Sequence, residues 1–250
     1  MDDVSLAAEL AREAGELAAS MLADGLKTEY KSSVSDVVSA ADHAAEELIT
    51  ARLAEHRADD ALVGEEGARR SGGARTWYVD PVDGTYNFLS GLPYWCSAIG
   101  LADEDGPLVG AVYFPPRDEL WVGGREAPTT LNGEPVTELV DRPLADVSVA
   151  THFHPRHLGE RDRVSSWRAV TSGAATVRML GSASVDLAGV ANGRLGLFLQ
   201  ANLNPWDWVP GAALVIGAGG VAEELPIGDM RWQIAGNRQS VADAAAALRR

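Results

Sequence analysis

The stretch WYVDPVDGTYNF, residues 77–88, places two carboxylates directly after an apolar run. Only a proline and a valine separate Asp80 from Asp83, and a glycine and a threonine follow at once. Carboxylates that close together repel each other unless a positive charge lies between them. The stretch therefore predicts a cation site, provided that further acidic residues converge on it.

Other acidic residues also lie at the ends or starts of apolar elements. Asp42 lies in a predicted helix, Glu65 follows the strand-like run ALVG, and Asp207 opens a late helix. Loops at strand ends and helix starts are common positions for binding residues. If these groups converge with Asp80 and Asp83, they form an oxygen-rich cluster of the kind that Mg²⁺ prefers. Two such cations, roughly 3.5–4 Å apart, would activate a water and neutralise a leaving oxygen in phosphoryl transfer.

Each of these residues also has a structural explanation when it is taken alone. Asp83 before Gly-Thr suits a turn, and Asp207 suits a helix N-cap. It is their combination that favours a metal site. Gly84 then allows close approach of the backbone to a ligand, and a turn or helix that starts there directs N–H groups at an anion. Thr85 would accept a proton from the attacking water and pass it to a carboxylate.

Composition and charge limit the partners of the protein. The chain has 250 residues, enough to bury a good core. Lys and Arg number 21 against 36 Asp and Glu, a net charge of −15, which argues against a nucleic acid or an anionic membrane as partner. The N-terminal residues are unlike a signal peptide, no run is long enough to span a membrane, and the single Cys96 fits a reducing compartment. We therefore expect a cytoplasmic protein.

Apolar periodicity predicts that helices and strands mix along the whole chain. The predicted helices cover 4–22, 39–54, 162–170, 182–191, 206–216 and 241–249. The predicted strands cover 61–63, 76–79, 95–102, 108–114, 120–122, 147–151, 176–180, 195–199 and 221–223. The three strands between 95 and 122 form an expected antiparallel meander. The acidic residues of the helix over 39–54 are expected on its solvent side.

This mixture predicts an α/β or α+β fold with layered sheets. Residues 134–143 are the predicted boundary between two halves of the chain. We expect an N-terminal α+β half, 1–138, that carries the metal-binding motifs, and a C-terminal α/β half, 139–250, that completes the site.

Four sequence blocks, taken in order, resemble a known family. They are KSSVSDVVSAAD (31–42), GEEG (64–67), DPVDGT (80–85) with the following Asn87-Phe88, and WDWVPGAALVIGAGG (206–220). One block alone would be moderate evidence, but four in order are highly specific. The chain is identified as a member of the inositol monophosphatase superfamily of Mg²⁺-dependent, lithium-sensitive phosphatases. The resemblance implies a layered αβαβα sandwich of the inositol monophosphatase and fructose bisphosphatase type.

The resemblance also implies roles for individual residues. The metal ligands would be Glu65, Asp80, Asp83, Asp207 and the backbone carbonyl of Val82. Glu65 and Thr85 would position the attacking water, with Asp42 hydrogen-bonded to Thr85. The backbone N–H groups of Gly84 and Thr85 would hold the phosphate. The substrate would contact Asp83, Gly181, Ser182, Ala183, Gln200 and Asp207, while Lys31 and Glu66 stand at matching places without a clear role.

Three departures from the family pattern concern the substrate end of the site. Gln200 stands where inositol phosphatases place a glutamate that binds inositol hydroxyls, and an amide donates as well as accepts hydrogen bonds. Pro210 replaces a small residue, but a helix tolerates proline in its first turn, so we expect Asp207 to keep its place. Gly217 replaces a frequent glutamate, and the sequence alone offers no interpretation.

The segment THFHPRH, residues 151–157, carries three histidines. His152, His154 and His157 would suit a transition-metal site, but a polar loop after a strand is the simpler interpretation. A third interpretation places one of them in the substrate pocket, since the segment lies near the substrate rim in the family.

The sequence therefore predicts a cytoplasmic phosphomonoesterase with Mg²⁺ as cofactor, about two or three ions per active site. The resemblance implies a homodimer, and on the resemblance alone inositol 1-phosphate is the leading substrate. Histidinol phosphate, fructose 1,6-bisphosphate, nucleotide 3′-phosphates and other sugar phosphates remain alternatives with the same chemistry. An alternative of another class is a catalytically silent relative that binds a phosphorylated ligand.

Overall fold

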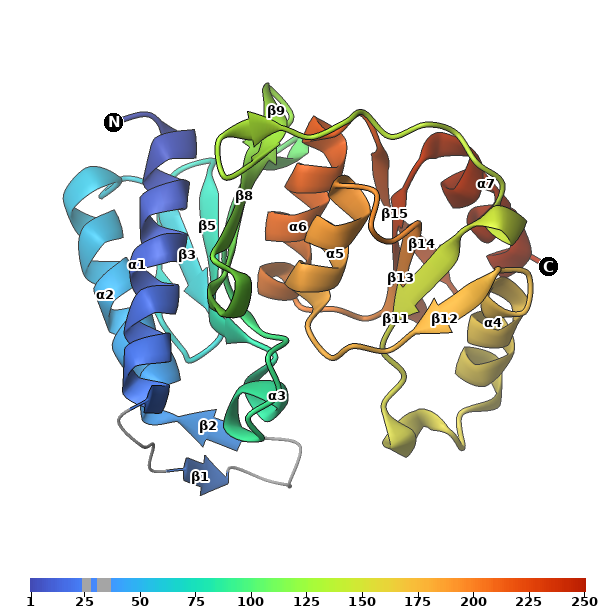
Figure 1. Ribbon diagram of the computed structural model, residues 1–250, viewed down its shortest axis with the longest axis horizontal. Helices are drawn as coiled ribbons and strands as arrows, with labels where there is room; N and C mark the ends of the chain where they lie inside the picture. Colours follow the sequence, from blue (N-terminus) through green and yellow to red (C-terminus); the bar gives the residue numbers. More distant parts are fainter. Residues whose placement is uncertain (24–27, 31–36) are drawn as a thin grey trace.

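The chain folds into five alternating layers of helices and sheets. The computed structural model describes residues 1–23, 28–30 and 37–250. The long helices of this part are α1 (Asp3–Ala23), α2 (Ala40–His56), α4 (Arg161–Thr171), α5 (Ala183–Ala191), α6 (Pro205–Gly217) and α7 (Arg238–Leu248). In Figure 1, α1 and α2 cover the outer face of one sheet, α5 and α6 lie between two sheets, and α4 and α7 cover the far face. The expected αβαβα sandwich is confirmed.

The first sheet carries the acidic motif of the opening stretch. It has eight strands in the order β10-β9-β8-β7-β6-β5-β3-β4. Their bounds are β3 (Ala61–Gly64), β4 (Arg69–Arg70), β5 (Thr76–Asp83), β6 (Cys96–Asp103), β7 (Gly106–Phe114), β8 (Glu119–Gly124), β9 (Ala127–Leu131) and β10 (Glu134–Pro135). Strands β6, β7 and β8 form the expected antiparallel meander, whereas β3 and β5 run parallel.

The second sheet has five strands, in the order β12-β11-β13-β15-β14. They are β11 (Ser148–Thr151), β12 (Thr176–Arg178), β13 (Leu197–Ala201), β14 (Val221–Ile227) and β15 (Met230–Gly236). The sequence did not predict β15, which runs antiparallel between β13 and β14. Two short strands, β1 (Thr28–Tyr30) and β2 (Val37–Ser39), pair with each other, and the short helix α3 (Thr85–Leu89) follows β5.

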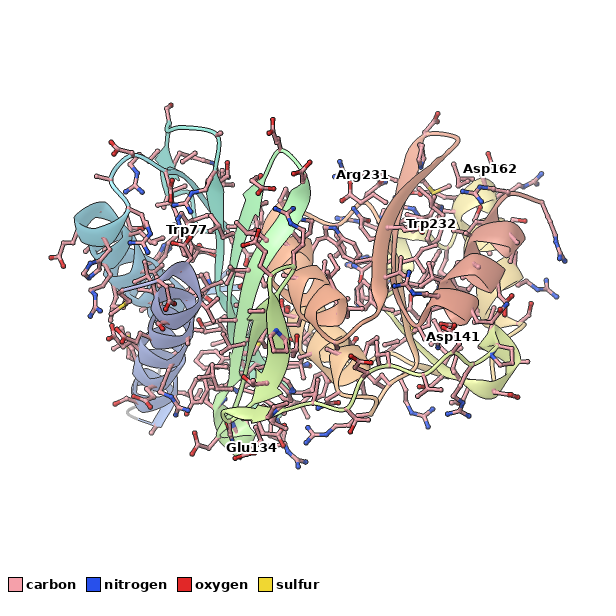
Figure 2. All side chains as sticks on the ribbon, turned by 90° about the horizontal axis from the view of Figure 1, so that it is seen from above. Trp77, Glu134, Asp141, Asp162, Arg231 and Trp232 are labelled. Carbon is pink, nitrogen blue, oxygen red and sulfur yellow. The ribbon has the colours of Figure 1, made fainter. Side chains whose placement is uncertain are left out.

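Apolar side chains fill the spaces between the layers. Figure 2, seen from above, shows Trp77 between the first sheet and the outer helices α1 and α2, and Trp232 at the second sheet. The chain crosses from one sheet to the other between Glu134 and Asp141 along one edge of the molecule. No helix among the described residues combines the length and the hydropathy that a membrane span requires.

Helix α6 packs closely against the first sheet, and this packing explains two departures in the sequence. Pro210 lies inside α6 and not in its first turn, which Pro205 begins, so the expected first-turn position of Pro210 was wrong, although Asp207 keeps its expected place. Gly100 of β6 leaves room for Pro210, since a Cβ there would lie 2.8 Å from the Pro210 nitrogen. At the other end of α6, a Cβ on Gly217 would lie 2.6 Å from the hydroxyl oxygen of Thr129. A glutamate at 217 would therefore require the β8–β9 hairpin to move.

Candidate active site

Three aspartates meet where the first sheet faces the start of α6. Carboxylate oxygens of Asp80, Asp83 and Asp207 all lie within 4.8 Å of one another. In a regular strand, residues three apart point to opposite faces. The pairing of β5 with β6 shifts register between Asp80 and Asp83, and such a bulge adds a residue that redirects side chains. The bulge therefore allows both aspartates to face Asp207.

Burial and mutual repulsion make these carboxylates difficult to ionise. Burial, followed by the charge of Asp207, raises the pKa of Glu65 to about 8. Burial and the charge of Asp83 raise the pKa of Asp207 to about 7. The pKa of Asp80 rises well above its ordinary value through burial and the charges of Glu65, Asp83 and Asp207. Burial also raises the pKa of Asp83. Glu65 therefore belongs electrostatically to the same cluster.

The donor set of this cluster fits a hard divalent cation. Asp80 Oδ1 is buried and has no hydrogen-bond partner among the described residues. A buried carboxylate oxygen without a donor is unfavourable, and Mg²⁺ takes carboxylate oxygens as ligands. A cation would favour the ionised form of each group and so remove the penalty that raises their pKa values.

The loop that carries Glu65 is held by a carboxylate and an arginine that the sequence analysis did not select. The Glu46 carboxylate accepts hydrogen bonds from the backbone N–H groups of Glu66, at 2.9 Å, and Ala68, at 2.8 Å. The Arg69 guanidinium donates to the Gly64 carbonyl. It also lies over the Trp206 ring, 5.5 Å from its centroid, next to Asp207. These contacts join the Glu65 loop to the start of α6.

Asp42 and Glu46 lie on the buried side of α2, so the prediction that the acidic residues of this helix face solvent was wrong for these two. They are only 2% and 5% exposed, whereas Glu47 on the same helix is exposed. Asp42 and Glu46 are one turn apart and share the buried face with Ile49. A charged residue on an apolar helix face was the signal that would have identified Glu46.

The DPVDGT segment meets a second segment about a hundred residues further along the chain. Asp83 accepts hydrogen bonds from the N–H groups of Ala183, at 3.3 Å, and Ser184, at 2.5 Å. Gly84 has a φ of 95°, and a Cβ there would lie 3.0 Å from the Tyr94 carbonyl and 3.2 Å from that of Gly181. A side chain at position 84 would therefore separate the two segments.

Three further residues selected from the sequence make the following contacts. The Thr85 hydroxyl donates to the Val82 carbonyl at 2.9 Å. Ser182 caps α5 by accepting a hydrogen bond from Val185 N. Glu66, whose side chain is largely buried, lies 3.7 Å from His43. The predicted hydrogen bond between Asp42 and Thr85 stays a prediction, and Lys31 lies outside the described residues.

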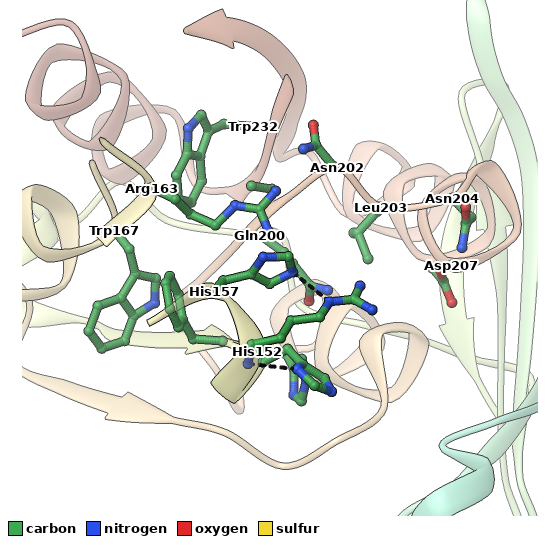
Figure 3. A pocket seen from close by; sticks show the side chains of 14 residues that line it. His152, His157, Arg163, Trp167, Gln200, Asn202, Leu203, Asn204, Asp207 and Trp232 are labelled. Carbon is green, nitrogen blue, oxygen red and sulfur yellow. Dashed lines mark hydrogen bonds between the residues drawn. The ribbon is translucent and has the colours of Figure 1, made fainter. Parts of the chain in front are cut away.

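The aspartate cluster opens into a cleft made of two adjoining cavities. The nearer one, about 160 Å³, is lined by Asp83, His152, Gly181, Ser182, Ala183, Asp186, Gln200, Leu203 and Asp207. The larger one, about 420 Å³, lies beyond it and is drawn in Figure 3. The two share His152, Gln200, Leu203 and Asp207. The predicted substrate contacts thus surround the nearer cavity, and Gln200 lies where the two cavities meet.

The three histidines of the 151–157 segment line the larger cavity. The ring centroids of His152 and His154 lie 6.2 Å apart, and those of His154 and His157 lie 6.1 Å apart. Within the described part of the chain, the three aspartates converge as a metal-ligand group and the histidines do not. The geometry therefore favours a place on the cleft for these histidines and not a transition-metal site.

Comparison with known proteins assigns the chain to a family. The model of the inositol monophosphatase family matches residues 2–245. The sequence is 38% identical over 191 residues to an inositol-1-monophosphatase of Rhizobium meliloti, covering 74% of this chain and 71% of the relative. It is 33% identical over 211 residues to a fructose-1,6-bisphosphatase/inositol-1-monophosphatase of Aquifex aeolicus, covering 81% and 78%.

A solved structure supports the same assignment. The crystal structure of extragenic suppressor protein suhB from Bartonella henselae superposes with a TM-score of 0.87 and 30% sequence identity, covering 98% of each chain. With its sandwich fold and its aspartate cluster at a cleft, the chain belongs to the inositol monophosphatase family of phosphatases.

Proposed function

We propose that this chain is a Mg²⁺-dependent phosphomonoesterase that hydrolyses a small phosphate ester by direct attack of water. The observation that carries the proposal is the convergence of Asp80, Asp83 and Asp207 to within 4.8 Å at the inner end of a cleft. Glu65 adds a fourth carboxylate whose charge acts on the same group. Purely structural carboxylates would pair with arginine or lysine, whereas these face one another.

The acidic cluster would hold the metal ions of the proposed reaction. Glu65, Asp80, Asp83, Asp207 and the Val82 carbonyl would hold Mg²⁺, as the family resemblance implies. When bound, Mg²⁺ supplies positive charge that makes a water more acidic and stabilises charge on the phosphoryl and leaving oxygens.

The protein's own groups would position the attacking water and the phosphate. Glu65 and Thr85 orient the water, and Asp42 receives its proton through the Thr85 hydroxyl. The Thr85 hydroxyl, which donates its one hydrogen to the Val82 carbonyl in this structure, would accept from the water and turn that hydrogen towards Asp42 as the proton passes. N–H groups of Gly84 and Thr85 lie at the start of α3, where the helix itself offers them no acceptor, and would bind phosphate oxygens.

The nearer cavity would hold the alcohol part of the ester. Gly181, Ser182, Ala183 and Gln200 line it and would contact the alcohol, and inositol 1-phosphate is the substrate that the family favours. Gln200 supplies an uncharged amide where a glutamate would carry charge. Histidinol phosphate, fructose 1,6-bisphosphate and nucleotide 3′-phosphates are the alternatives. A cytoplasmic homodimer is proposed on the family resemblance.

Phosphate release from a panel of phosphomonoesters tests the proposal. We expect turnover with Mg²⁺ and none in EDTA, while p-nitrophenyl phosphate serves as a substrate without a specific alcohol. Calorimetry would confirm separately that Mg²⁺ binds. If Mg²⁺ binds but no ester is hydrolysed, the catalytically silent alternative replaces the enzyme.

A further inference from the structure

The outer part of the cleft carries positive charge in a protein that is strongly acidic. Arg156 and Arg163 both line the larger cavity, although the chain as a whole has a net charge of −15. Asp207, at the inner end, is the one carboxylate among the residues that line this cavity in the described part of the chain. The cleft therefore has an acidic inner end and a basic outer end.

A chain of polar contacts holds the two arginines in place. Arg156 Nε donates to His157 Nε2 at 3.0 Å, and His157 Nδ1 lies 2.6 Å from Glu160 Oε1. The other oxygen of Glu160 lies 3.2 Å from Arg163 Nε. Because arginine can only donate, His157 Nε2 accepts and His157 Nδ1 carries the hydrogen. His157 is then a neutral bridge, and the positive charge comes from the arginines.

These contacts leave a net positive charge at the outer end of the cleft. Glu160 offsets one of the two arginines, so the group keeps one net positive charge. The side chain of Arg163 is only 11% exposed. Among the described residues, Arg163 Nε is buried without a hydrogen-bond partner, although it forms an ion pair with Glu160. Figure 3 shows its guanidinium pointing from the Trp232 side of the cavity towards Gln200. A largely buried guanidinium that lines a cavity favours an anion there over water alone, because an anion supplies both acceptors and the opposite charge.

We infer that the substrate carries a second oxyanion, a phosphate or a carboxylate, on the part of its alcohol remote from the scissile phosphate, and that Arg163 and Arg156 bind this group. The inference rests on the proposed function. It deepens that proposal, because the nearer cavity holds the alcohol and shares Gln200 with the larger one. The planar guanidinium matches the two oxygens of either anion.

A second oxyanion site ranks the candidate substrates by the charge on their alcohol part. A cationic alcohol such as histidinol is disfavoured, since the outer cavity would repel it. A neutral alcohol such as inositol leaves the arginines unpaired. A sugar bisphosphate or a phosphorylated sugar acid satisfies both ends of the cleft.

Three esters that differ at one carbon test the inference. Glucose 1-phosphate is neutral at C6, glucuronic acid 1-phosphate has a carboxylate there, and glucose 1,6-bisphosphate has a phosphate. KM is measured for each, or the inhibition constant against p-nitrophenyl phosphate. We expect the constant of at least one of the two C6 anions to be lower than that of glucose 1-phosphate by about tenfold or more. Which of the two binds better distinguishes a phosphate from a carboxylate.

Arginine variants separate binding from folding. Arg163→Gln should raise the constant of the preferred C6 anion by about ten- to a hundredfold, with kcat and the constant for glucose 1-phosphate within about twofold. Arg156→Gln should act in the same direction. Arg163→Lys should restore part of the effect, because lysine keeps the charge and loses the planar fork. Arg168→Gln, on the exposed side of the same helix, is the matched control and should change nothing.

The outcomes separate the inference from the proposed function. If all three esters bind alike, or if Arg163→Gln shifts their constants equally, the second oxyanion site is wrong although the phosphatase stands. If no ester is hydrolysed, calorimetry with the same three compounds still measures their preference, and equal affinities there also overturn the inference. If Arg163→Gln does not fold, Arg156→Gln and Arg163→Lys decide the outcome.

Discussion

Asp80 occupies the least favourable position for a negative charge in the described site. It is buried, one of its oxygens lacks a hydrogen-bond donor, and Glu65, Asp83 and Asp207 all oppose its ionisation. The folded-state pKa values of this cluster lie above those of the unfolded chain. The protonated groups therefore favour the fold at low pH, and this contribution is lost as the pH rises through about 7 and 8, the values of Asp207 and Glu65.

In the absence of metal, the free energy of unfolding should consequently fall between pH 5 and pH 9. Mg²⁺ should raise the Tm more at pH 8.5 than at pH 6, because it binds the ionised carboxylates. Thermal unfolding in EDTA and in Mg²⁺ measures both effects. Asp80→Asn serves as the control, since it removes the most strongly opposed carboxylate and should flatten the pH profile. A Mg²⁺ effect that is equal at both pH values would contradict this account.

Asp207→Asn should separate stability from activity at the same site. The substitution removes a negative charge that opposes Glu65 and Asp80, so the metal-free variant should be at least as stable as the parent at pH 8.5. Turnover should fall by about a hundredfold or more, since the loss even of a residue that only supports a metal ligand typically costs 10–100-fold. Mg²⁺-dependent phosphate release and the Tm in EDTA are the two measurements. Kinetics like those of the parent would exclude Asp207 from the metal site.

At the scale of elements, the sequence predicted those parts whose pattern is local. The apolar periodicity of α1, the meander β6–β8 and the DPVDGT turn were all found, because neighbouring residues determine them. Strand β15 was missed, although the two-residue turn Gly228-Asp229 between Ile227 and Met230 is a hairpin signal.

Other features depend on segments distant in the sequence and were not predicted. The bulge that turns Asp80 and Asp83 to one face depends on the register with β6. The contact of Arg69 with Trp206 requires the fold to bring residues from both halves together. Neither has a local sequence pattern. The acidic site residues could therefore be predicted from the sequence, whereas the contacts that position them could not.

Glu46 shows how α2 supports the acidic loop of the first sheet. Glu46→Ala should leave the N–H groups of Glu66 and Ala68 without their acceptor and lower the free energy of unfolding by about 2–3 kcal/mol. Turnover should fall about tenfold as Glu65 loses its fixed position. Glu46→Gln keeps one acceptor oxygen and should have the smaller effect in both measurements, urea unfolding and kcat. Equal losses in the two variants would show that the side chain's volume, and not its hydrogen bonds, supports the loop.

At the scale of the whole molecule, the two sheets share the layer formed by α5 and α6. Phe198 of the second sheet and Trp121 of the first belong to one apolar cluster with Trp208 of α6. The Thr129 hydroxyl of β9 donates to the Leu214 carbonyl of α6 at 2.7 Å. We propose that the boundary between 1–138 and 139–250 marks a change of sheet and not two independently folding domains.

This arrangement predicts one cooperative unfolding transition for both halves. Urea unfolding followed by far-UV circular dichroism should have the same midpoint as hydrogen exchange of peptides from β7 and from β15. The isolated segment 1–138 should bind a hydrophobic dye, because the face that α6 covers would be exposed. Two separate midpoints would show that the halves are independent folding units.

The two ends of the cleft differ in how freely their sequence can be altered. The inner end is assembled from Gly84, Asp83 and the start of α5, where any added atom meets backbone. One wall of the outer end is formed by side chains of residues 152–163, several of which project from an exposed loop and the first turn of α4. A mutant library confined to this outer segment would therefore explore new esters while the hydrolytic centre stays intact. The fold in this way offers the protein engineer a specificity module that can be exchanged independently of the reaction.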